Sequence, residues 1–541
     1  MDTINRLITW GKSHILILIL LLATTLRLFN LASNPPGLNW DEVSMGYSAY
    51  SLLETGKDEW GVSWPLLFRS YGEWKSPVYI YLLIPFIKVF GLNAWAVRLP
   101  AAIAGILAVY LTYLIGKKLY SENVGLWAAL LLSVSQWHLM LSRPGFEAGV
   151  ALTLVLAGIY LFLKEKPIFA TLPLGIAIHT YHSAKLVVPI IIVYLAISNF
   201  KKIGFKKLAI SALILGIFAL PIATDLLTGR SQKRFAQVGI TTDAELVERF
   251  FKYRGTFPLG DLAGKLVFNK YTFILSKGFS NWTSYLSPHF LLGSESIRAQ
   301  HSIPFRGVLY FTEFALIIFG LTLLFKKYSG VARYLPLLMI AIGFVPPALT
   351  KDIYHVLRSI LTLPWWQLLA AIGIVELQNN KKFHKLFTFT LLLLTCEILI
   401  LLFQYFAWYP KAFAKDWQYG YKQAVEYIET SDKPYKEIFF TKTYGEPQIF
   451  VAFYSKLDPK IYQEASKSWL EYESLGLPWL DQLKTYKLGN YTFGDIRYMG
   501  GSRGGDTLYV GKADDFWADT HVLQKIDFAD HNNAFTITDG Q

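Results

Sequence analysis

The sequence is poor in cysteine and in charged residues, and both shortages narrow what the protein can be. Cys396 is the single cysteine among 541 residues, and it lies inside an apolar run. One cysteine excludes an intramolecular disulfide and a cysteine-based metal site, so we expect a small apolar packing residue. Charged residues make up 17% of the chain, whereas soluble domains contain about a quarter. A protein built on one large soluble core is therefore excluded.

Long apolar runs are present instead. Hydrophobic residues make up 53% of the chain, and several runs approach or exceed the roughly 18 residues that span a bilayer. The sequence therefore predicts a polytopic α-helical membrane protein. Lys and Arg in short cytoplasmic loops explain the formal charge of +13 better than nucleic acid does. The first run, Ile15 to Leu26, has no convincing cleavage site, which predicts a retained signal anchor with a cytoplasmic N-terminus.

The distribution of lysine and arginine between loops gives an expected topology. The segment from Val78 to Phe90 is short and contains Pro85 and Lys88, so we expect a juxtamembrane or re-entrant helix rather than a span. With this segment left out, the lysine-rich loops all face the cytoplasm and the C-terminus lies outside. About eleven spans are expected, at roughly 15–31, 99–116, 124–141, 149–163, 168–181, 186–197, 208–223, 308–325, 334–349, 356–375 and 386–405.

Two domains are expected from the change in composition near residue 409. Residues 1–408 would form the transmembrane domain, with outer loops at about 32–97 and 225–306. Residues 409–541 would form a small extracytoplasmic α/β domain, because segments with strand-like alternation begin there. The expected local elements are an amphipathic interfacial helix at 244–251, a helix at 417–429, strands at 437–441, 507–510, 522–528 and 534–538, and a turn or flexible loop at 500–505.

Ionisable residues gather on the outer side of this topology. Such groups are costly near hydrocarbon, so they generally mark a functional site. Asp41 and Glu42 equally suit a helix N-terminus, where acids complement the helix dipole and Asp41 could be the cap. Arg143 and Arg358 could be interfacial side chains that reach for water, or could bind a phosphate. The outer set comprises Asp41, Glu42, Glu73, Lys75, Arg143, Glu147, His179, His182, Lys185, Asp352, His355 and Arg358.

The order of motifs in the first half resembles a known family. After the first span come Pro35-Pro36-Gly37-Leu38-Asn39-Trp40-Asp41-Glu42, Lys75-Ser76-Pro77, Phe90-Gly91, Arg98-Leu99-Pro100 and Ser142-Arg143. This pattern resembles the GT-C fold membrane glycosyltransferases related to protein O-mannosyltransferases and to the aminoarabinose transferase of lipid A. The resemblance extends to about Pro189. Lys75-Ser76-Pro77 replaces a Pro-Pro pair that is frequent in relatives, but the lysine is kept.

The resemblance implies an enzyme of the plasma membrane. A sugar would move from a polyprenyl-phosphate-linked donor to a hydroxyl on a protein, lipid or glycan at the extracytoplasmic face. Asp41 or Glu42 would be the catalytic base, with Asp41 preferred, and Glu147 would match a second acidic position. The remaining implied roles are donor-phosphate binding by Lys75, Arg143, Lys185 and Arg358, and substrate binding by Glu73, Tyr181, His182 and His355.

The chemistry of such a transfer suits this residue set. A hydroxyl is a poor nucleophile until a carboxylate takes its proton, and general-base help is worth about 10²–10⁴-fold. A phosphate leaving group needs cations to hold its charge rather than a dedicated acid. A divalent cation stays open as a cofactor, because two acids could hold one. His179 and His182 lack an evident third ligand and suit interfacial polar residues better than a metal site.

Two other classes of protein are weighed against the enzyme. A transporter for a lipid-linked glycan would bury ionisable groups near the bilayer midplane and show internal repeats. The sequence places its charges at the outer rim and has no repeat. A non-catalytic scaffold with a glycan-binding outer domain would use the acids only as helix caps. The sequence identifies neither the sugar nor the acceptor.

Overall fold

The chain forms two compact units. Unit 1 comprises residues 1–27, 102–142 and 147–401, and unit 2 comprises residues 28–101, 143–146 and 402–541. The computed structural model describes residues 2–72, 74–227, 238–258, 261–293, 298–498, 506–517 and 519–539. Glu73 and the predicted loop at 500–505 lie outside the described residues. The predicted division near residue 408 stays a prediction.

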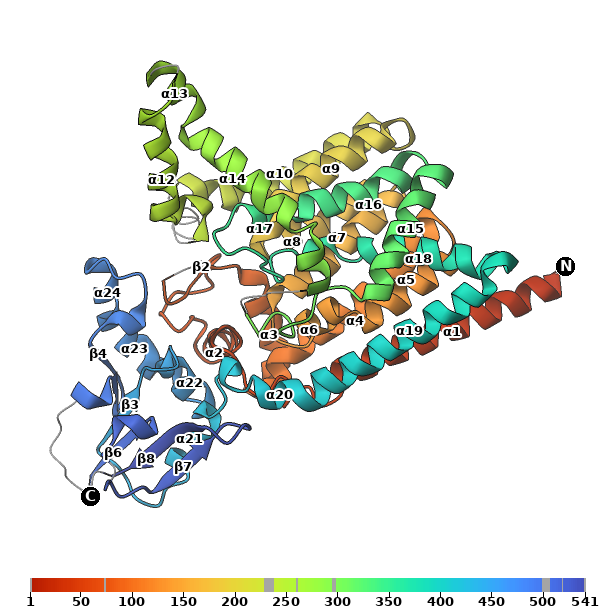
Figure 1. Ribbon diagram of the computed structural model, residues 1–541. Helices are drawn as coiled ribbons and strands as arrows, with labels where there is room; N and C mark the ends of the chain where they lie inside the picture. The colour runs from red at the N-terminus through yellow and green to blue at the C-terminus, as the bar shows by residue number, and fades with distance from the viewer. Residues whose placement is uncertain are drawn as a thin grey trace. The chain divides into compact units, whose positions relative to one another are not determined.

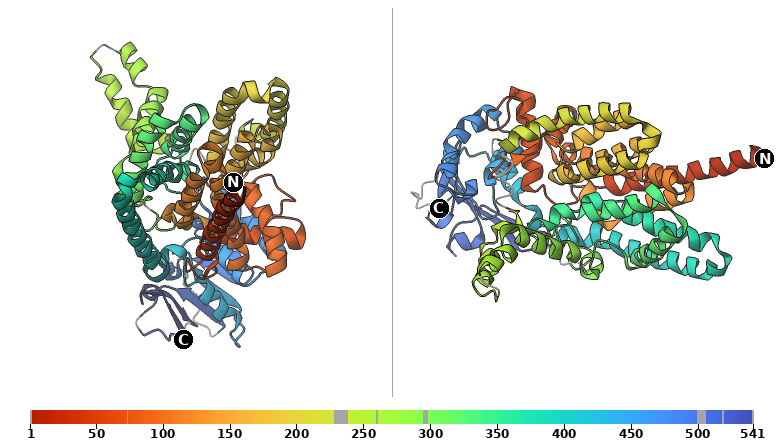
Figure 2. Two further views of the ribbon diagram at one scale, coloured as in Figure 1. Left: turned by 90° about the vertical axis from the view of Figure 1, so that its right-hand side faces the viewer. Right: turned by 90° about the horizontal axis from the view of Figure 1, so that it is seen from above.

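Unit 1 is helical (Figure 1). Its helices are α1 (Asp2–Leu28), α4 (Ala94–Leu119), α5 (Glu122–Val134), α6 (Gln136–Ser142), α7 (Glu147–Leu163), α8 (Pro167–Ala177), α9 (His182–Ile203), α10 (Phe205–Leu227), α12 (Ala244–Gly255), α13 (Asp261–Val267), α14 (Lys270–Ser284), α15 (Phe311–Lys327), α16 (Gly330–Gly343), α17 (Val345–Ala348), α18 (Trp365–Asn379) and α19 (His384–Phe403). α8 packs against α7 and α10, and α9 lies beside α10 (Figure 2).

The described helices confirm a multi-pass helical membrane protein. Seven are long and apolar enough to cross a membrane, or eight if α5 and α6 form one broken span. Other apolar helices are shorter: the 17 residues of α7 extend about 25 Å, against a hydrocarbon core of roughly 30 Å. The expected count of eleven spans stays a prediction.

Two of the predicted spans differ from the structure: one is bent in the middle, and the other begins later than predicted. The span predicted at 124–141 is bent by 60° between α5 and α6. Ser135 interrupts the helix there because its hydroxyl accepts from the His138 amide (3.4 Å), as an N-cap residue does. The span predicted from residue 356 becomes an α-helix only at Trp365, after a 3₁₀ turn over Ile360–Thr362. Pro364, which has no N–H, stands at this N-cap.

Small residues let the central helices of unit 1 approach closely. A Cβ on Gly320 of α15 would lie 1.9 Å from the Leu369 carbonyl oxygen on α18. A Cβ on Gly373 of α18 would likewise lie 2.8 Å from the Leu316 oxygen on α15. Without side chains at these points, van der Waals packing between the two backbones stabilises the pair.

The predicted helix at 244–251 is confirmed and extends over Ala244–Gly255. The Asp243 side chain caps it by accepting from the Leu246 amide at 3.0 Å. Its location at the membrane interface stays a prediction.

Unit 2 contains a six-stranded mixed sheet of order β4-β5-β3-β6-β8-β7 (Figure 1). β3 pairs in parallel with β5 and β6, and the outer pairs are antiparallel. The four predicted strands are confirmed as β3, β6, β7 and β8, whereas β4 and β5 were not predicted. The strand bounds are β3 Glu437–Thr441, β4 Thr485–Leu488, β5 Tyr491–Gly494, β6 Thr507–Gly511, β7 Gln524–Asp527 and β8 Asn533–Thr538.

Helices of unit 2 come from both ends of the chain. The helix predicted at 417–429 is confirmed from Tyr421 onward, and Lys415–Trp417 form a 3₁₀ turn before it. The Tyr421 ring of α21 stacks on Phe440 of β3 at 5.7 Å and on Phe450 of α22 at 4.1 Å. The helices are α2 (Trp40–Thr55), α3 (Pro77–Phe90), α20 (Tyr409–Ala412), α21 (Tyr421–Glu429), α22 (Pro447–Tyr454), α23 (Pro459–Trp469) and α24 (Glu471–Ser474), and β1 (Phe68–Arg69) pairs with β2 (Trp74–Lys75).

Candidate active site

The first turn of α2 fixes the two neighbouring acids in different surroundings. Asn39, and not Asp41, is the N-cap: its side chain accepts from the Glu42 amide at 2.9 Å. The Glu42 carboxylate accepts in return from the Asn39 amide at 3.1 Å, which completes a capping box. Asp41 and Glu42 therefore both lie in the first helical turn, where the dipole favours acids. The two side chains leave the helix on different sides.

Glu42 is buried and fully engaged. Its side chain and that of Arg98 are 0% exposed, and the Arg98 Nε atom lies 2.8 Å from the Glu42 Oε1 atom. The second carboxylate oxygen accepts from Arg98 Nη2 at 3.1 Å, which makes the pair bidentate. Oε1 also accepts from the Gly145 amide at 2.8 Å. Arg98 donates further to the carbonyls of Leu31 and Pro35. Glu42 thus joins three chain segments.

Asp41 is partly exposed and forms an ion pair with the buried Lys75. The Lys75 Nζ atom lies 2.9 Å from Asp41 Oδ1, and the side chains are 10% and 41% exposed, respectively. A partly exposed carboxylate can receive a proton from a bound hydroxyl, whereas a carboxylate enclosed by donors cannot. Of the two acids left open by the sequence, the geometry favours Asp41 as the base.

The short hairpin of β1 and β2 positions Lys75. Phe68 pairs with Lys75 and Arg69 with Trp74 in antiparallel register. The Arg69 guanidinium lies 5.3 Å from the Trp74 ring and forms an ion pair with Glu473 at 2.9 Å. These contacts hold the hairpin, so the Lys75 ammonium is presented to Asp41 by a fixed backbone.

Two buried carboxyl groups surround the same lysine. Burial, together with the charge of Asp58, raises the pKa of Glu59 to about 8, and the Lys75 charge opposes the rise. Burial likewise raises the pKa of Glu446 to about 8, again against Lys75. Glu446 accepts from the Gln448 amide at 2.6 Å. Near neutral pH both groups are largely protonated, whereas Asp41 forms an ion pair with Lys75.

Arg143 is enclosed by backbone and aromatic groups of unit 2. Its Nη2 atom donates to the carbonyls of Phe29 and Asn34, both at 2.8 Å. Its guanidinium lies 5.0 Å from the Phe406 ring and 5.5 Å from the Tyr405 ring. The side chain is 0% exposed. These contacts give Arg143 a part in holding the segment after α1, and its expected phosphate contact stays a prediction.

Unit 1 holds the remaining predicted residues. Arg358 lies 3.5 Å from Asp352, which also faces Arg298 at 3.8 Å. The Arg358 amide donates to His355 Nδ1 at 3.4 Å, and the His355 ring lies 4.9 Å from the ring of His301. The structure therefore brings Arg358 and His355 together in one polar cluster of unit 1.

The start of α9 lies beside this cluster. Ser183 donates to the Arg358 carbonyl at 3.1 Å. Tyr181 is the N-cap residue of α9, and His182 and Lys185 lie in its first turn. Glu147 is the first residue of α7. Their predicted roles remain predictions.

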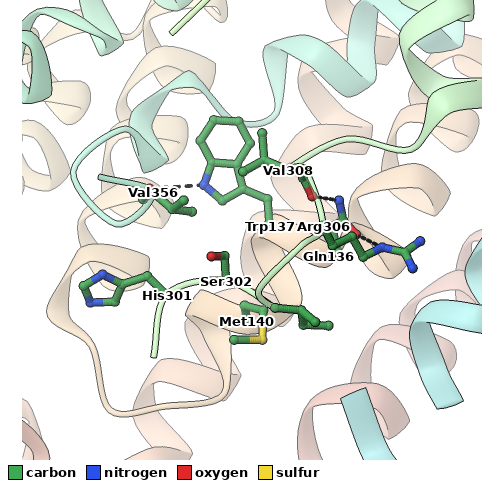
Figure 3. Close-up of a pocket in the computed structure, with 10 residues that line it drawn as sticks. Gln136, Trp137, Met140, His301, Ser302, Arg306, Val308 and Val356 are labelled. Carbon is green, nitrogen blue, oxygen red and sulfur yellow. Dashed lines mark hydrogen bonds between the residues drawn. The ribbon is translucent and has the colours of Figure 1, made fainter. Parts of the chain in front are cut away.

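A cavity beside this cluster is too small to hold a substrate. It measures about 10 Å³ and is lined by Trp137, Met140, His301 and Ser302, among others (Figure 3). The Trp137 indole donates to the Val356 carbonyl at 3.2 Å across it. A volume of this size holds at most about one water molecule.

Four charged residues of these sites were not assigned a role from the sequence. Arg98 appeared only within a motif, and its partner Glu42 lies 56 positions earlier. Arg298, Glu59 and Glu446 were not singled out. The Asp58-Glu59 pair repeats the adjacent-acid signal of Asp41-Glu42, so the sequence contained a pointer to Glu59. In the part of the chain that the structure describes, no three His, Cys, Asp or Glu side chains are grouped to hold a metal ion.

Comparisons with known sequences match parts of the chain. Residues 74–224 match the family model of dolichyl-phosphate-mannose-protein mannosyltransferases. Dolichyl-phosphooligosaccharide-protein glycotransferase 2 of Pyrococcus furiosus is 34% identical over 127 residues, 22% of this chain and 17% of the relative. "Putative mannosyltransferase YycA" of Bacillus subtilis is 26% identical over 194 residues, 34% of this chain and 28% of the relative. The matched region thus spans less than a third of either curated relative.

A comparison with solved structures covers almost the whole chain. The fold is similar to that of ArnT from Cupriavidus metallidurans bound to undecaprenyl phosphate. The TM-score is 0.54, the sequence identity is 12%, and the match covers 97% of each chain. At this identity the likeness concerns the fold alone.

Proposed function

We propose that the chain is a GT-C type glycosyltransferase that transfers a sugar at the extracytoplasmic face of the membrane. The donor is a polyprenyl-phosphate-linked sugar, and the acceptor is a hydroxyl on a protein, lipid or glycan. The similar ArnT was solved with undecaprenyl phosphate, which supports this donor class. The matched mannosyltransferase family makes a hexose, with mannose first, the sugar to test.

The Asp41–Lys75 pair is the observation that carries this proposal. It combines a partly exposed carboxylate with a largely buried ammonium at 2.9 Å. Transfer from a phosphate-linked donor needs both groups at one place: a base for the acceptor and a cation for the leaving phosphate. Before substrates bind, each group neutralises the other.

In the proposed reaction, donor binding changes the partner of Lys75. The ammonium turns from Asp41 to the donor phosphate, and Asp41 then accepts the proton of the acceptor hydroxyl. The acceptor oxygen forms a bond to the anomeric carbon while the bond from that carbon to the phosphate oxygen breaks. The electron pair stays on the phosphate, where Lys75 stabilises the new charge. Sugar, proton and charge are thereby all accounted for.

Glu42 is a positioning residue in this scheme. It is bound by Arg98 and by the amides of Asn39 and Gly145, so it holds the start of α2 in place. Fixing the helix start fixes the direction of the neighbouring Asp41 side chain. We propose that Arg358 and Lys185 help to bind the donor phosphate. For six further residues the roles expected from the sequence remain proposals: His355, His182, Tyr181, Glu73, Arg143 and Glu147.

A transfer assay tests the function. Purified protein is incubated with radiolabelled undecaprenyl-phosphate-mannose or -glucose and with envelope fractions that supply protein, lipid and glycan acceptors. We expect label to leave the lipid and enter one acceptor fraction. Binding of the donors without any movement of label would contradict the proposal and favour a scaffold.

A further inference from the structure

The sheet of unit 2 carries a polar pocket outside the Asp41–Lys75 pair. It measures about 460 Å³, which is in the range of small-molecule sites. Residues that follow three strands line it: Thr443 after β3, Asp495 and Arg497 after β5, and Lys512 and Asp514 after β6. β3 pairs in parallel with β5 on one side and with β6 on the other, so the carboxyl ends of the three strands meet at one edge.

This edge is a topological switch point. β3 lies between β5 and β6; after β3 the chain continues to β4 and β5 on one side, and after β6 it continues to β7 and β8 on the other. The chain therefore leaves β3 and β6 in opposite directions, which opens a crevice between their carboxyl ends. Open α/β sheets bind ligands in this crevice.

The charges of the pocket balance. Three cations and three carboxylates line it: Lys442, Arg497, Lys512, Asp495, Asp514 and Asp515. An anionic ligand would meet the carboxylates, and a cation would meet the basic groups. A ligand with many hydroxyl groups suits both, because each hydroxyl donates to a carboxylate and accepts from an ammonium or guanidinium.

Internal contacts hold the lining in place before any ligand arrives. The Lys442 ammonium donates to the Asp481 carbonyl at 2.7 Å. Arg497 donates to the Asp514 carbonyl at 2.6 Å. The Lys512 ammonium lies 5.6 Å from the centre of the neighbouring Tyr444 ring, which helps to hold it in place. A site organised in this way loses little side-chain entropy on binding.

The pocket is directly connected to the start of α2. Thr443 lines it, and a Cβ added to Gly445, two residues later, would lie 3.4 Å from the Trp40 ring. Two residues of chain extend at most about 7 Å. The Trp40 amide donates to Gln418, whose amide donates to the Tyr444 carbonyl at 3.4 Å. The loop after β3 therefore joins the pocket to the residue that precedes Asp41.

We propose that this pocket binds a neutral glycan and presents the acceptor side of the transfer to Asp41. The ligand class follows from the balanced charge and the hydroxyls of Thr441 and Thr443. The link to transfer rests on the proposed function, whereas the binding of a neutral glycan does not.

The experiment measures binding to the full chain without donor. The protein is kept in lauryldimethylamine oxide, since a detergent with a sugar headgroup would compete. Saturation-transfer NMR is recorded with maltose, N,N′-diacetylchitobiose and methyl α-mannoside. Thr443→Val and Asp514→Ala remove exposed lining groups, and Asp432→Ala removes an exposed acid that does not line the pocket.

We expect at least one probe to bind. Asp514→Ala should lower its affinity about tenfold or more, the size of one lost hydrogen bond to a charged group, and Thr443→Val should lower it about two- to tenfold, the size of one lost neutral hydrogen bond. Asp432→Ala should bind as the natural chain does. Absence of binding by all three probes, or equal binding by the pocket variants, would overturn the proposal. Sugar transfer is measured separately. If the protein transfers sugar but binds no probe, this inference is wrong and the proposed function still stands.

Discussion

At the scale of single residues, Asp41 and Glu42 are neighbours in sequence with opposite surroundings. Glu42 is 0% exposed and meets Arg98 in a bidentate ion pair, whereas Asp41 is 41% exposed and meets Lys75. Burial makes the first pair a structural element, because removing one partner leaves a charge uncompensated. Exposure makes the second pair available for proton transfer.

Removal of Arg98 should therefore damage the fold and not only the reaction. We expect Arg98→Met to lower stability by about 3–5 kcal/mol, because the Glu42 charge would be left buried and unpaired. The measurement is the yield and the thermal midpoint of the detergent-purified protein. In the double variant Glu42→Gln/Arg98→Met the loss should be smaller; an equal or larger loss would contradict this role for the pair.

Glu446 predicts how stability depends on pH. Its pKa is raised to about 8 by burial and by the charges of Asp481 and Asp41, and lowered by Lys75. The folded state therefore keeps a proton that the unfolded state releases near its ordinary pKa of about 4.3. Stability should fall as pH rises between these values, by at most about 1.4 kcal/mol per pH unit, and level off above about 8.

The variant Glu446→Gln tests this dependence. It keeps an uncharged group that can still accept from Gln448, so its thermal midpoint should fall less than that of the natural chain between pH 5 and pH 8.5. Glu464→Gln, at an exposed position, is the matched control. Parallel pH curves for Glu446→Gln and the natural chain would show that this carboxyl is not titrating.

At the scale of elements, close backbone approach fixes the segment before α2. A Cβ on Gly37 would lie 2.2 Å from the Trp417 carbonyl oxygen, and backbone cannot move aside cheaply. Arg98 also donates to the Gly37 carbonyl. Gly37→Ala should therefore lower the thermal midpoint and reduce sugar transfer, since the start of α2 would shift.

A glycine in open surroundings provides the control for this substitution. Gly216 on α10 has nothing within 4 Å of an added Cβ. Gly216→Ala should leave the midpoint unchanged or raise it, because alanine favours helix. If Gly37→Ala also left the thermal midpoint unchanged, the close backbone approach at Gly37 would contribute nothing to stability.

Elements were predictable where local pattern sufficed. Strands β3, β6, β7 and β8 followed from runs of apolar and β-branched residues. The β4–β5 hairpin was missed although Tyr486 and Leu488 alternate with exposed residues and Gly489-Asn490 form a two-residue loop, a pattern typical of a hairpin. The break at Ser135 was missed although Ser133, Ser135 and Gln136 interrupt the apolar run from 124 to 141. Its cause is a single side-chain cap.

The site was predictable only in part, because a local sequence pattern does not show contacts between distant residues. Asp41, Lys75 and Arg358 stood out because charges are rare near membrane spans. The partners that decide their chemistry come from distant positions: Arg98 for Glu42, and Glu446 from the C-terminal segment for the surroundings of Lys75. Tertiary packing sets these pairs, and no local pattern contains them.

At the scale of the whole molecule, the proposed transfer requires one orientation in the membrane. The loop charges predict that the C-terminus lies outside the cytoplasm. Alkaline phosphatase fused after Gln541 should be active in intact cells. A green fluorescent protein fused there should not fluoresce, because it does not fold into its fluorescent form after export by the Sec pathway. The reverse pattern would move the proposed site to the cytoplasmic face.

The most direct measurement is sugar transfer by Asp41→Asn in a single turnover with radiolabelled donor. Asparagine preserves shape but cannot take the acceptor proton, so we expect the rate to fall by about 10²-fold or more. The thermal midpoint should match that of the natural chain, and Asp432→Asn should transfer normally. An Asp41→Asn rate within about twofold of the natural rate would contradict the role of Asp41 as the base.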